Sequence, residues 1–232
     1  MSTFKDKGVV LKEYAAGEYD KNLLLLLKER GRVNVFAKGA RKPNSKFFAG
    51  TQLFCYCEFV IFEGSGFLSL TQTELIQNFY RLTEDYDKFL SAGSFLTLAG
   101  EMLLPAMPSA DALYLLIKAF QALSKELMDK RLVRSVFEIK FMQTEGYSPQ
   151  LDECIHCGES VSGALFFEPQ GVVCKNCAHR ALKAVAVSDQ TVAIMRYILN
   201  HDTKDLFKLT VANPAVIENL QAVSQFFVKN NR

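Results

Sequence analysis

The most specific stretch of this sequence reads Cys154-Ile-His-Cys157, then sixteen residues, then Cys174-Lys-Asn-Cys177. Two cysteine pairs, each with two residues between its members, can bring four sulfur atoms onto one tetrahedral ion, and this spacing is typical of a zinc site. Four cysteine ligands leave no coordination position for a catalytic water, so we predict a structural zinc ion. The predicted ligands are Cys154, Cys157, Cys174 and Cys177.

Two disulfide bonds or a redox-active pair are the alternatives for these cysteines. Residues 1–8 lack the apolar core of a signal peptide, and no apolar run reaches the length that a membrane span needs. We therefore expect a protein of the reducing cytoplasm, where a metal site is favoured over disulfide bonds. His156 and His179 lie beside the cysteines, and we expect neither of them to bind the metal.

The composition is that of a folded protein with a modest overall charge. The 232 residues suit one large domain or two smaller ones, and a hydrophobic share of 49% is enough for buried cores. The formal net charge is only +2, which by itself indicates no class of partner. The charge is unevenly distributed, because residues 1–81 hold twelve Lys and Arg against eight Asp and Glu.

The first eighty residues carry the pattern of β-structure. Short apolar or alternating runs predict strands at 8–11, 23–27, 32–36, 52–63 and 67–73. Five consecutive leucines form the second run, where periodicity alone does not separate a buried strand from a helix. Five strands, with a tight Gly64-Ser-Gly66 turn before the last, fit a small barrel such as the OB-fold.

Beyond residue 81 the apolar residues recur with the period of a helix. The predicted helices span 85–104, 111–130, 131–145, 188–200 and 213–228. Gly146 should end the third helix, Ser188 should begin the fourth, and Asn213 with Pro214 should begin the fifth. We therefore predict an α+β chain with an N-terminal OB-fold barrel at 1–80. An α-helical domain at 81–232 should follow, with the zinc module inserted at about 150–182.

The most basic segment lies between two of the predicted strands. Seven cationic side chains fall within nineteen residues that contain one acid: Lys28, Arg30, Arg32, Lys38, Arg41, Lys42 and Lys46. The segment is either a solvated hairpin tip or a loop that contacts nucleic-acid phosphates and displaces their counterions. The aromatic residues nearby could stack on bases or belong to the core. They are Phe36, Phe47, Phe48 and Tyr56.

Motifs of catalysis are missing from the sequence. The three histidines form no spacing that suggests a nucleophile and its base. The run Gly39-Ala-Arg-Lys42 lacks the second glycine of a phosphate-binding loop. We expect no enzymatic activity.

The order of several short motifs resembles the RecO family of bacterial recombination mediators. The motifs of the first eighty residues are Gly8-Val-Val-Leu-Lys12, Gly17-Glu-Tyr-Asp20, Glu29-Arg-Gly-Arg32, Lys38-Gly-Ala-Arg-Lys-Pro43 and Leu70-Thr-Gln-Thr-Glu74. The later motifs are Phe137-Glu-Ile-Lys-Phe141, Glu145-Gly-Tyr-Ser-Pro149 and Leu151-Asp-Glu-Cys-Ile-His-Cys-Gly158.

The resemblance implies that the barrel binds single- and double-stranded DNA and that the protein anneals complementary strands. It also implies a partnership with RecR, with which members of this family help RecA to replace single-strand-binding protein on DNA. Members do not hydrolyse ATP. On this basis we expect a cytoplasmic protein that joins the nucleoid during repair, with DNA contacts at Arg32, Lys38, Arg41, Lys42 and Lys46. The alternative is an adaptor that recruits RecR or single-strand-binding protein and scarcely binds DNA.

Overall fold

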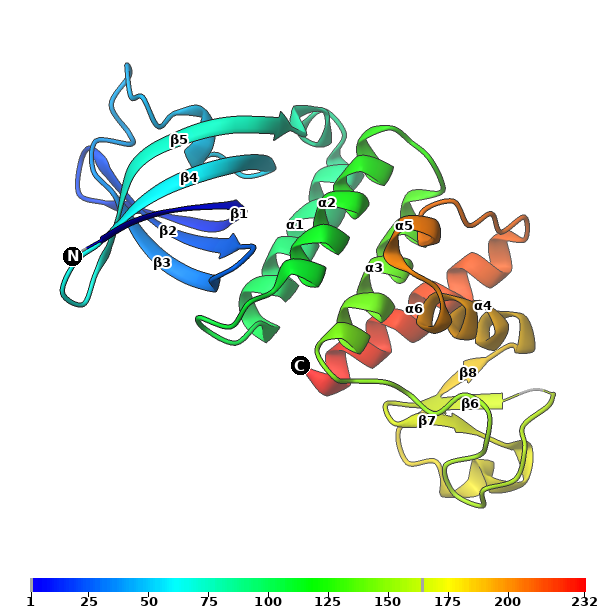
Figure 1. Ribbon diagram of the computed structural model, residues 1–232. Helices are drawn as coiled ribbons and strands as arrows, with labels where there is room; N and C mark the ends of the chain where they lie inside the picture. The colour runs from blue at the N-terminus through cyan, green and yellow to red at the C-terminus, as the bar shows by residue number, and fades with distance from the viewer. Residues whose placement is uncertain (1, 164) are drawn as a thin grey trace. The chain divides into compact units, whose positions relative to one another are not determined.

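Five strands close into a barrel with the order β1-β2-β3-β5-β4 (Figure 1). The computed structural model describes residues 2–163 and 165–232. Neighbouring strands are antiparallel, except that β3 and β5 meet through a parallel pairing of Phe36 with Ser69. This closed order confirms the predicted OB-fold. The strands are β1 (Ser2–Ala16), β2 (Asp20–Leu27), β3 (Gly31–Ala37), β4 (Cys55–Glu63) and β5 (Leu68–Asn78).

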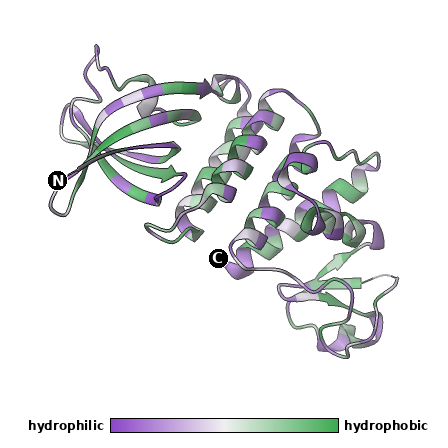
Figure 2. Ribbon diagram, in the orientation of Figure 1, coloured by the Kyte–Doolittle hydropathy of each residue, from purple (hydrophilic) through white to green (hydrophobic). Residues whose placement is uncertain are grey.

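The five leucines belong to β2, a strand that is covered on both faces. Leu23, Leu25 and Leu27 point into the barrel core. Leu24 and Leu26 alternate with them, and Leu26 is as fully buried as the core residues. A strand covered on both faces reads as a continuous apolar run, which explains why alternation was absent from this part of the sequence. Figure 2 shows the same concentration of apolar residues along β4.

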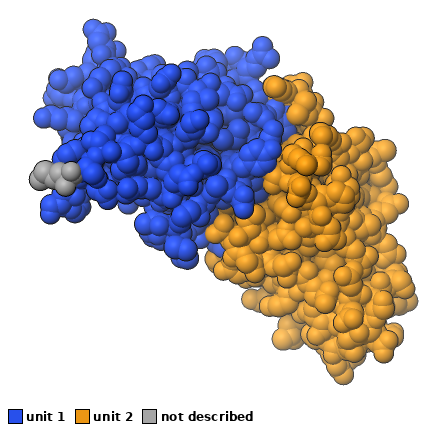
Figure 3. All heavy atoms as spheres, viewed as in Figure 1, with its two compact units in different colours: residues 1–124 blue, residues 125–232 orange. Residues whose placement is uncertain are grey.

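Two helices, α1 (Tyr86–Met102) and α2 (Ala110–Ser124), pack against the barrel. Phe54, which precedes β4, makes edge-to-face ring contacts with Phe89 of α1 and Phe120 of α2, at centroid distances of 5.8 and 5.6 Å. Residues 1–124 accordingly form one compact unit and residues 125–232 another (Figure 3). The change from strands to helices near residue 80 therefore falls inside the first unit.

The second unit combines helices with a small sheet of order β7-β6-β8 (Figure 1). Helix α3 packs along α6, and between them the buried Ser224 hydroxyl donates to the Glu138 carboxylate at 2.7 Å. Among the described residues, no helix combines the length and the apolar character that crossing a membrane requires. The elements are α3 (Lys130–Thr144), β6 (Leu165–Glu168), β7 (Gly171–Val173), β8 (Val185–Val187), α4 (Asp189–Asn200), α5 (Thr203–Leu206) and α6 (Pro214–Asn231).

The helix ends of this unit follow the capping residues expected from the sequence. The Ser188 hydroxyl accepts the Thr191 N–H at 3.1 Å at the start of α4, and Asn213 caps α6 with Pro214 in its first turn. Gly146 follows α3 with a φ of +92°, and its N–H is donated to the carbonyl of Gln143. These three predictions are confirmed.

Gly31 lets the start of β3 approach the connection between α1 and α2. It has a φ of +61°, and a Cβ atom at this position would lie 1.7 Å from the carbonyl oxygen of Met107. The next residue, Arg32, accepts the Ala106 N–H at 3.1 Å. Only glycine allows this close contact between barrel and helices.

We expect Gly31→Ala to lower the free energy of unfolding by at least about 2 kcal/mol, because the new Cβ must displace backbone as well as occupy a left-handed conformation. Gly17→Ala is the matched control. Its φ is +72°, but no atom lies within 4 Å of the added Cβ, so only conformational strain of about 1 kcal/mol should appear. Urea unfolding of both variants measures the difference, and equal losses would contradict the steric explanation.

Candidate metal centre and nucleic-acid interface

The structure brings the four predicted cysteine ligands together. Their sulfur atoms all lie within 4.8 Å of one another, and the sulfurs of Cys157 and Cys174 are 3.8 Å apart. Four sulfurs bound tetrahedrally at about 2.3 Å from one ion would be about 3.8 Å from each other. The geometry and the donor chemistry therefore fit a single metal ion with a closed coordination sphere.

Local hydrogen bonds hold the two cysteine turns in place. The Cys154 carbonyl accepts the N–H of Gly158, whose φ is +74°, and the Cys174 carbonyl accepts the N–H of Cys177. The Ile155 N–H donates to the carbonyl of Val172 at 3.0 Å, which ties the first turn to the β6–β7 hairpin. The Pro169-Gln-Gly171 turn between two short apolar runs in the sequence suits such a hairpin. These backbone hydrogen bonds therefore fix the positions of the sulfur atoms.

The surroundings of the cluster favour the thiolate form of one cysteine, Cys154. Burial tends to raise the pKa of the Cys154 thiol, but hydrogen bonds from three backbone N–H groups, including that of Cys174 at 3.3 Å, lower it to about 6. Burial and the three neighbouring thiols raise the pKa of Cys177 to about 12. A cation at the centre of the cluster would favour the thiolate form of all four residues.

The two histidines of the module lie outside this set. The cluster that could hold a metal consists, within the described residues, of the four cysteines alone. The Nε2 atom of His156 lies 3.5 Å from the Glu168 carboxylate, and His179 is exposed on a short 3-10 helix, η3 (Lys175–Arg180).

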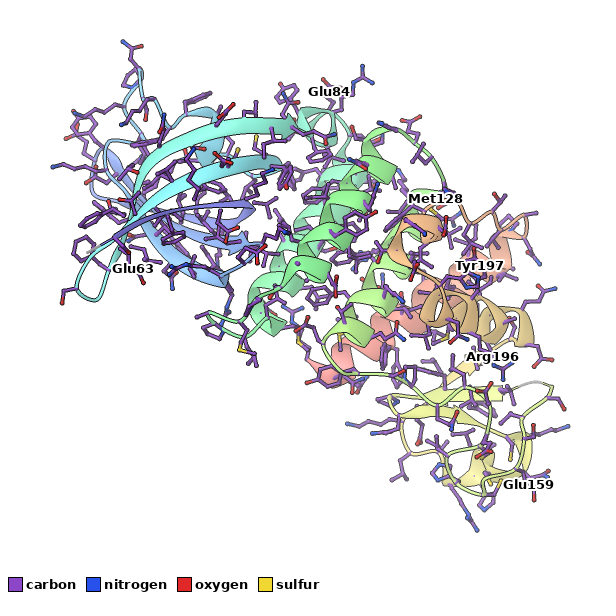
Figure 4. All side chains as sticks on the ribbon, in the orientation of Figure 1. Glu63, Glu84, Met128, Glu159, Arg196 and Tyr197 are labelled. Carbon is purple, nitrogen blue, oxygen red and sulfur yellow. The ribbon has the colours of Figure 1, made fainter. Side chains whose placement is uncertain are left out.

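Helix α4 contacts the start of the module through Arg196 (Figure 4). The Nε atom of Arg196 forms an ion pair with Asp152 at 2.8 Å, and its Nη2 donates to the carbonyl of Leu151. Helix α4, which follows the module in sequence, is thus joined directly to the start of the module, which fixes the entry of the chain into the first cysteine turn.

The basic loop, defined as residues 38–46, follows β3 and is bonded to the turn between β1 and β2. The Asp20 carboxylate accepts the Gly39 N–H at 2.6 Å, and the Tyr19 carbonyl accepts the Arg41 N–H at 2.8 Å. Gly39 has a φ of +72°, which glycine adopts without strain. The loop therefore has a defined path rather than the freedom of a hairpin tip.

Two buried apolar side chains anchor this part of the chain to the barrel. Ala40 and Phe47 are buried in the barrel core. The four predicted DNA-contacting residues of the loop are exposed: Lys38, Arg41, Lys42 and Lys46. Burial of the apolar residues stabilises the loop and leaves its cations on the surface.

The cations of the basic loop interact with backbone and aromatic groups. The Arg41 guanidinium donates to the carbonyl of Gly17 at 2.8 Å, and the Lys46 ammonium donates to the carbonyl of Thr71 at 2.9 Å. The Lys42 ammonium lies 5.7 Å from the ring centroid of Tyr19. No carboxylate of the described residues forms an ion pair with Lys38, Arg41, Lys42 or Lys46. Their charge is available to an anionic ligand.

Arg32 is the predicted contact that the structure does not bring to the loop. It lies on β3, half-buried, and its guanidinium donates to the carbonyl of Gly100 in α1. Its position links the barrel to the helices. Tyr19 is a residue of this surface that sequence reasoning missed, although the turn-forming run Gly17-Glu-Tyr-Asp20 gave a signal for an exposed tip.

Comparisons with known proteins cover almost the whole chain. Residues 1–79 match the family described as "Recombination protein O N terminal", and residues 83–230 match "Recombination protein O C terminal". The chain is 31% identical over 231 residues to "DNA repair protein RecO" of Acetivibrio thermocellus, covering 99% of this chain and 92% of that protein. It is 33% identical to the protein of the same name from Heliobacterium modesticaldum, over 96% and 83% of the two chains.

We expect Cys177→Ser to lose its bound metal, because a hydroxyl replaces one of four thiolates at a buried position. Elemental analysis of the purified variant measures metal per chain. Cys55→Ser is the matched control, since Cys55 is a half-buried cysteine of β4 outside the cluster, and it should retain the metal content of the parent protein. A full equivalent of metal in Cys177→Ser would place the binding site elsewhere.

Proposed function

Because this chain belongs to the RecO family of DNA repair and recombination proteins, we propose that it is a non-enzymatic DNA-binding recombination mediator. It binds single- and double-stranded DNA and anneals complementary strands. Together with RecR it helps RecA to replace single-strand-binding protein on DNA. It acts in the cytoplasm, at the nucleoid during repair. Family membership supports the role, and the basic loop supports the mode of DNA binding.

The observation that carries the DNA-binding proposal is a set of exposed cations on the basic loop that have no carboxylate partner. Lys38, Arg41, Lys42 and Lys46 are exposed on backbone whose path is fixed, and they face no carboxylate partner among the described residues. Such side chains neutralise phosphates and release condensed counterions. Phosphate contacts carry no sequence information, as a mediator that acts on any damaged sequence requires.

We propose that the metal of the four-cysteine cluster is zinc and that its role is structural. Zinc accepts four thiolate ligands in a tetrahedral arrangement, and such a closed site has no position for a water or a substrate. When bound, the ion contributes folding free energy to the module. The chain's own residues supply the hairpin and the two turns around it.

The second candidate is an adaptor that recruits RecR or single-strand-binding protein and scarcely binds DNA. The formal net charge of +2 for the whole chain favours it, because most strong DNA-binding surfaces are more basic. It predicts partner binding that responds little to salt, whereas the mediator requires DNA binding that weakens steeply as salt rises.

We expect the double substitution Arg41→Ala and Lys42→Ala to weaken binding to single-stranded DNA of any sequence. The slope of log affinity against log salt should become less steep by about 1.4, since each lost phosphate contact accounts for about 0.7. Fluorescence anisotropy with a labelled oligonucleotide across a salt series measures both effects. Lys204→Ala with Lys208→Ala removes the same charge from residues in and after α5, and should leave the slope unchanged. Identical slopes in all three proteins would exclude the loop.

We expect zinc removal by a chelator to lower the melting temperature of the protein. Structural zinc contributes on the order of 10 kcal/mol to a small module, and the core between α3 and α6 should reduce that loss here. Hydrogen exchange should show protection lost over residues 150–182 and retained in the barrel. X-ray absorption on the loaded protein should show sulfur neighbours at about 2.3 Å. An oxygen neighbour, or a melting temperature unaffected by chelation, would contradict a closed structural site.

A further inference from the structure

Phe48 is an exposed aromatic residue two positions beyond the basic loop. Its side chain is 62% exposed, whereas that of its neighbour Phe47 is only 5% exposed. Phe36 and Tyr56, the other aromatic residues near the loop in sequence, are half-buried in paired strands. The structure therefore separates the four aromatic candidates into three with packing roles and one whose ring faces water.

The backbone holds Phe48 in a fixed position. Its N–H donates to the carbonyl of Ser45 at 3.1 Å, and the carbonyl of Phe47 accepts the N–H of Thr51 at 3.0 Å. The burial of Phe47 in the barrel core fixes the chain immediately before it. A short 3-10 helix, η1 (Ala49–Thr51), begins immediately after it. An aromatic side chain has only two side-chain torsions, so a ring on such a backbone loses little entropy when a ligand binds.

The surroundings of Phe48 suit a polyanion with an aromatic group. Lys46 precedes it by two residues, and its ammonium is held by the carbonyl of Thr71. The other exposed ring of this surface, Tyr19, already lies beneath the Lys42 ammonium. Phe48 therefore offers an exposed ring two residues along the chain from Lys46, whose ammonium lies 4.9 Å from the ring centroid of Phe47, whereas Tyr19 orients a cation.

We propose that the Phe48 ring is a stacking platform for an unpaired nucleobase of a single strand whose phosphates contact the basic loop. The inference rests on the proposed DNA-binding function and adds strand selectivity to it. Every base has a π-face, so stacking tolerates any sequence. A base inside a duplex already stacks on its neighbours, so Phe48 should favour single strands over double strands. Cations on a loop do not provide that distinction by themselves.

The test uses Phe48→Trp, because the chain contains no tryptophan and the new side chain is then its only indole. We expect oligothymidylate to quench the indole fluorescence through stacking. An abasic oligonucleotide of the same length presents the phosphates without bases and should bind without quenching. Tyr86→Trp, at the exposed first residue of α1, is the matched control and should respond to neither oligonucleotide.

A second variant measures the contribution to affinity. Phe48→Ala should weaken single-strand binding about 5- to 150-fold, the range for loss of one stacked base. Its affinity for duplex DNA and the salt slope should match the parent protein, because no phosphate contact is removed. Phe48→Tyr keeps the ring and should bind as the parent does. Since Phe48 is exposed, all three variants should melt at the parent temperature.

The outcomes separate this inference from the function on which it rests. If anisotropy shows binding of both oligonucleotides but Phe48→Trp is not quenched, the platform is overturned and the DNA-binding function stands. Equal quenching by the abasic strand overturns it too, as does a Phe48→Ala variant that binds single strands normally. If neither oligonucleotide binds at low salt, the proposed function itself fails. A Phe48→Ala variant that then loses only RecR binding would assign the ring to a protein partner.

Discussion

A closed barrel must keep its core dry while the chain leaves one strand and returns in another. The segment between β3 and β4 meets this constraint with two phenylalanines, Phe47 in the barrel core and Phe54 against α1 and α2. Phe54 adopts a φ of +62°, a costly conformation for a residue with a side chain. Its two aromatic contacts offset that cost. Because Ala37 at the end of β3 and Phe47 are both buried, the cations of the basic loop between them lie at the surface, on a path that backbone hydrogen bonds define.

In the second unit, the four-cysteine cluster lies where the apolar core is small. Around the cysteines the buried apolar cluster is small: Val173 packs with Cys154 and Cys177, flanked by partly buried residues such as Ile155 and Phe166. A small core of this kind stabilises a fold only weakly against the loss of chain entropy, and an ion held by the four cysteines would add to that stabilisation. Both the exposed cations of the basic loop and the four-cysteine cluster therefore follow from how limited apolar material is distributed.

Features encoded by neighbouring residues were predictable from the sequence. The cysteine spacing, the β6–β7 hairpin and the caps at Ser188 and Asn213 each depend on a few consecutive positions. Contacts between distant residues were not. Arg32 looked like part of the basic segment because its partner Gly100 lies far along the chain. The full length of β1 was missed because its outer residues are polar and exposed, and β8 because three residues carry no period.

The packing of α3 on α6 has a consequence for synthesis of the protein on the ribosome. Helix α3 ends at Thr144, but α6 begins only at Pro214. At a few to about twenty residues added per second, several seconds separate the two helices. During that interval α3 lacks the helix that packs along it most extensively, although α4, which also packs on α3, is made earlier. The nascent chain therefore exposes this apolar side for a time that the rate of synthesis sets, and slower synthesis would lengthen its exposure to aggregation.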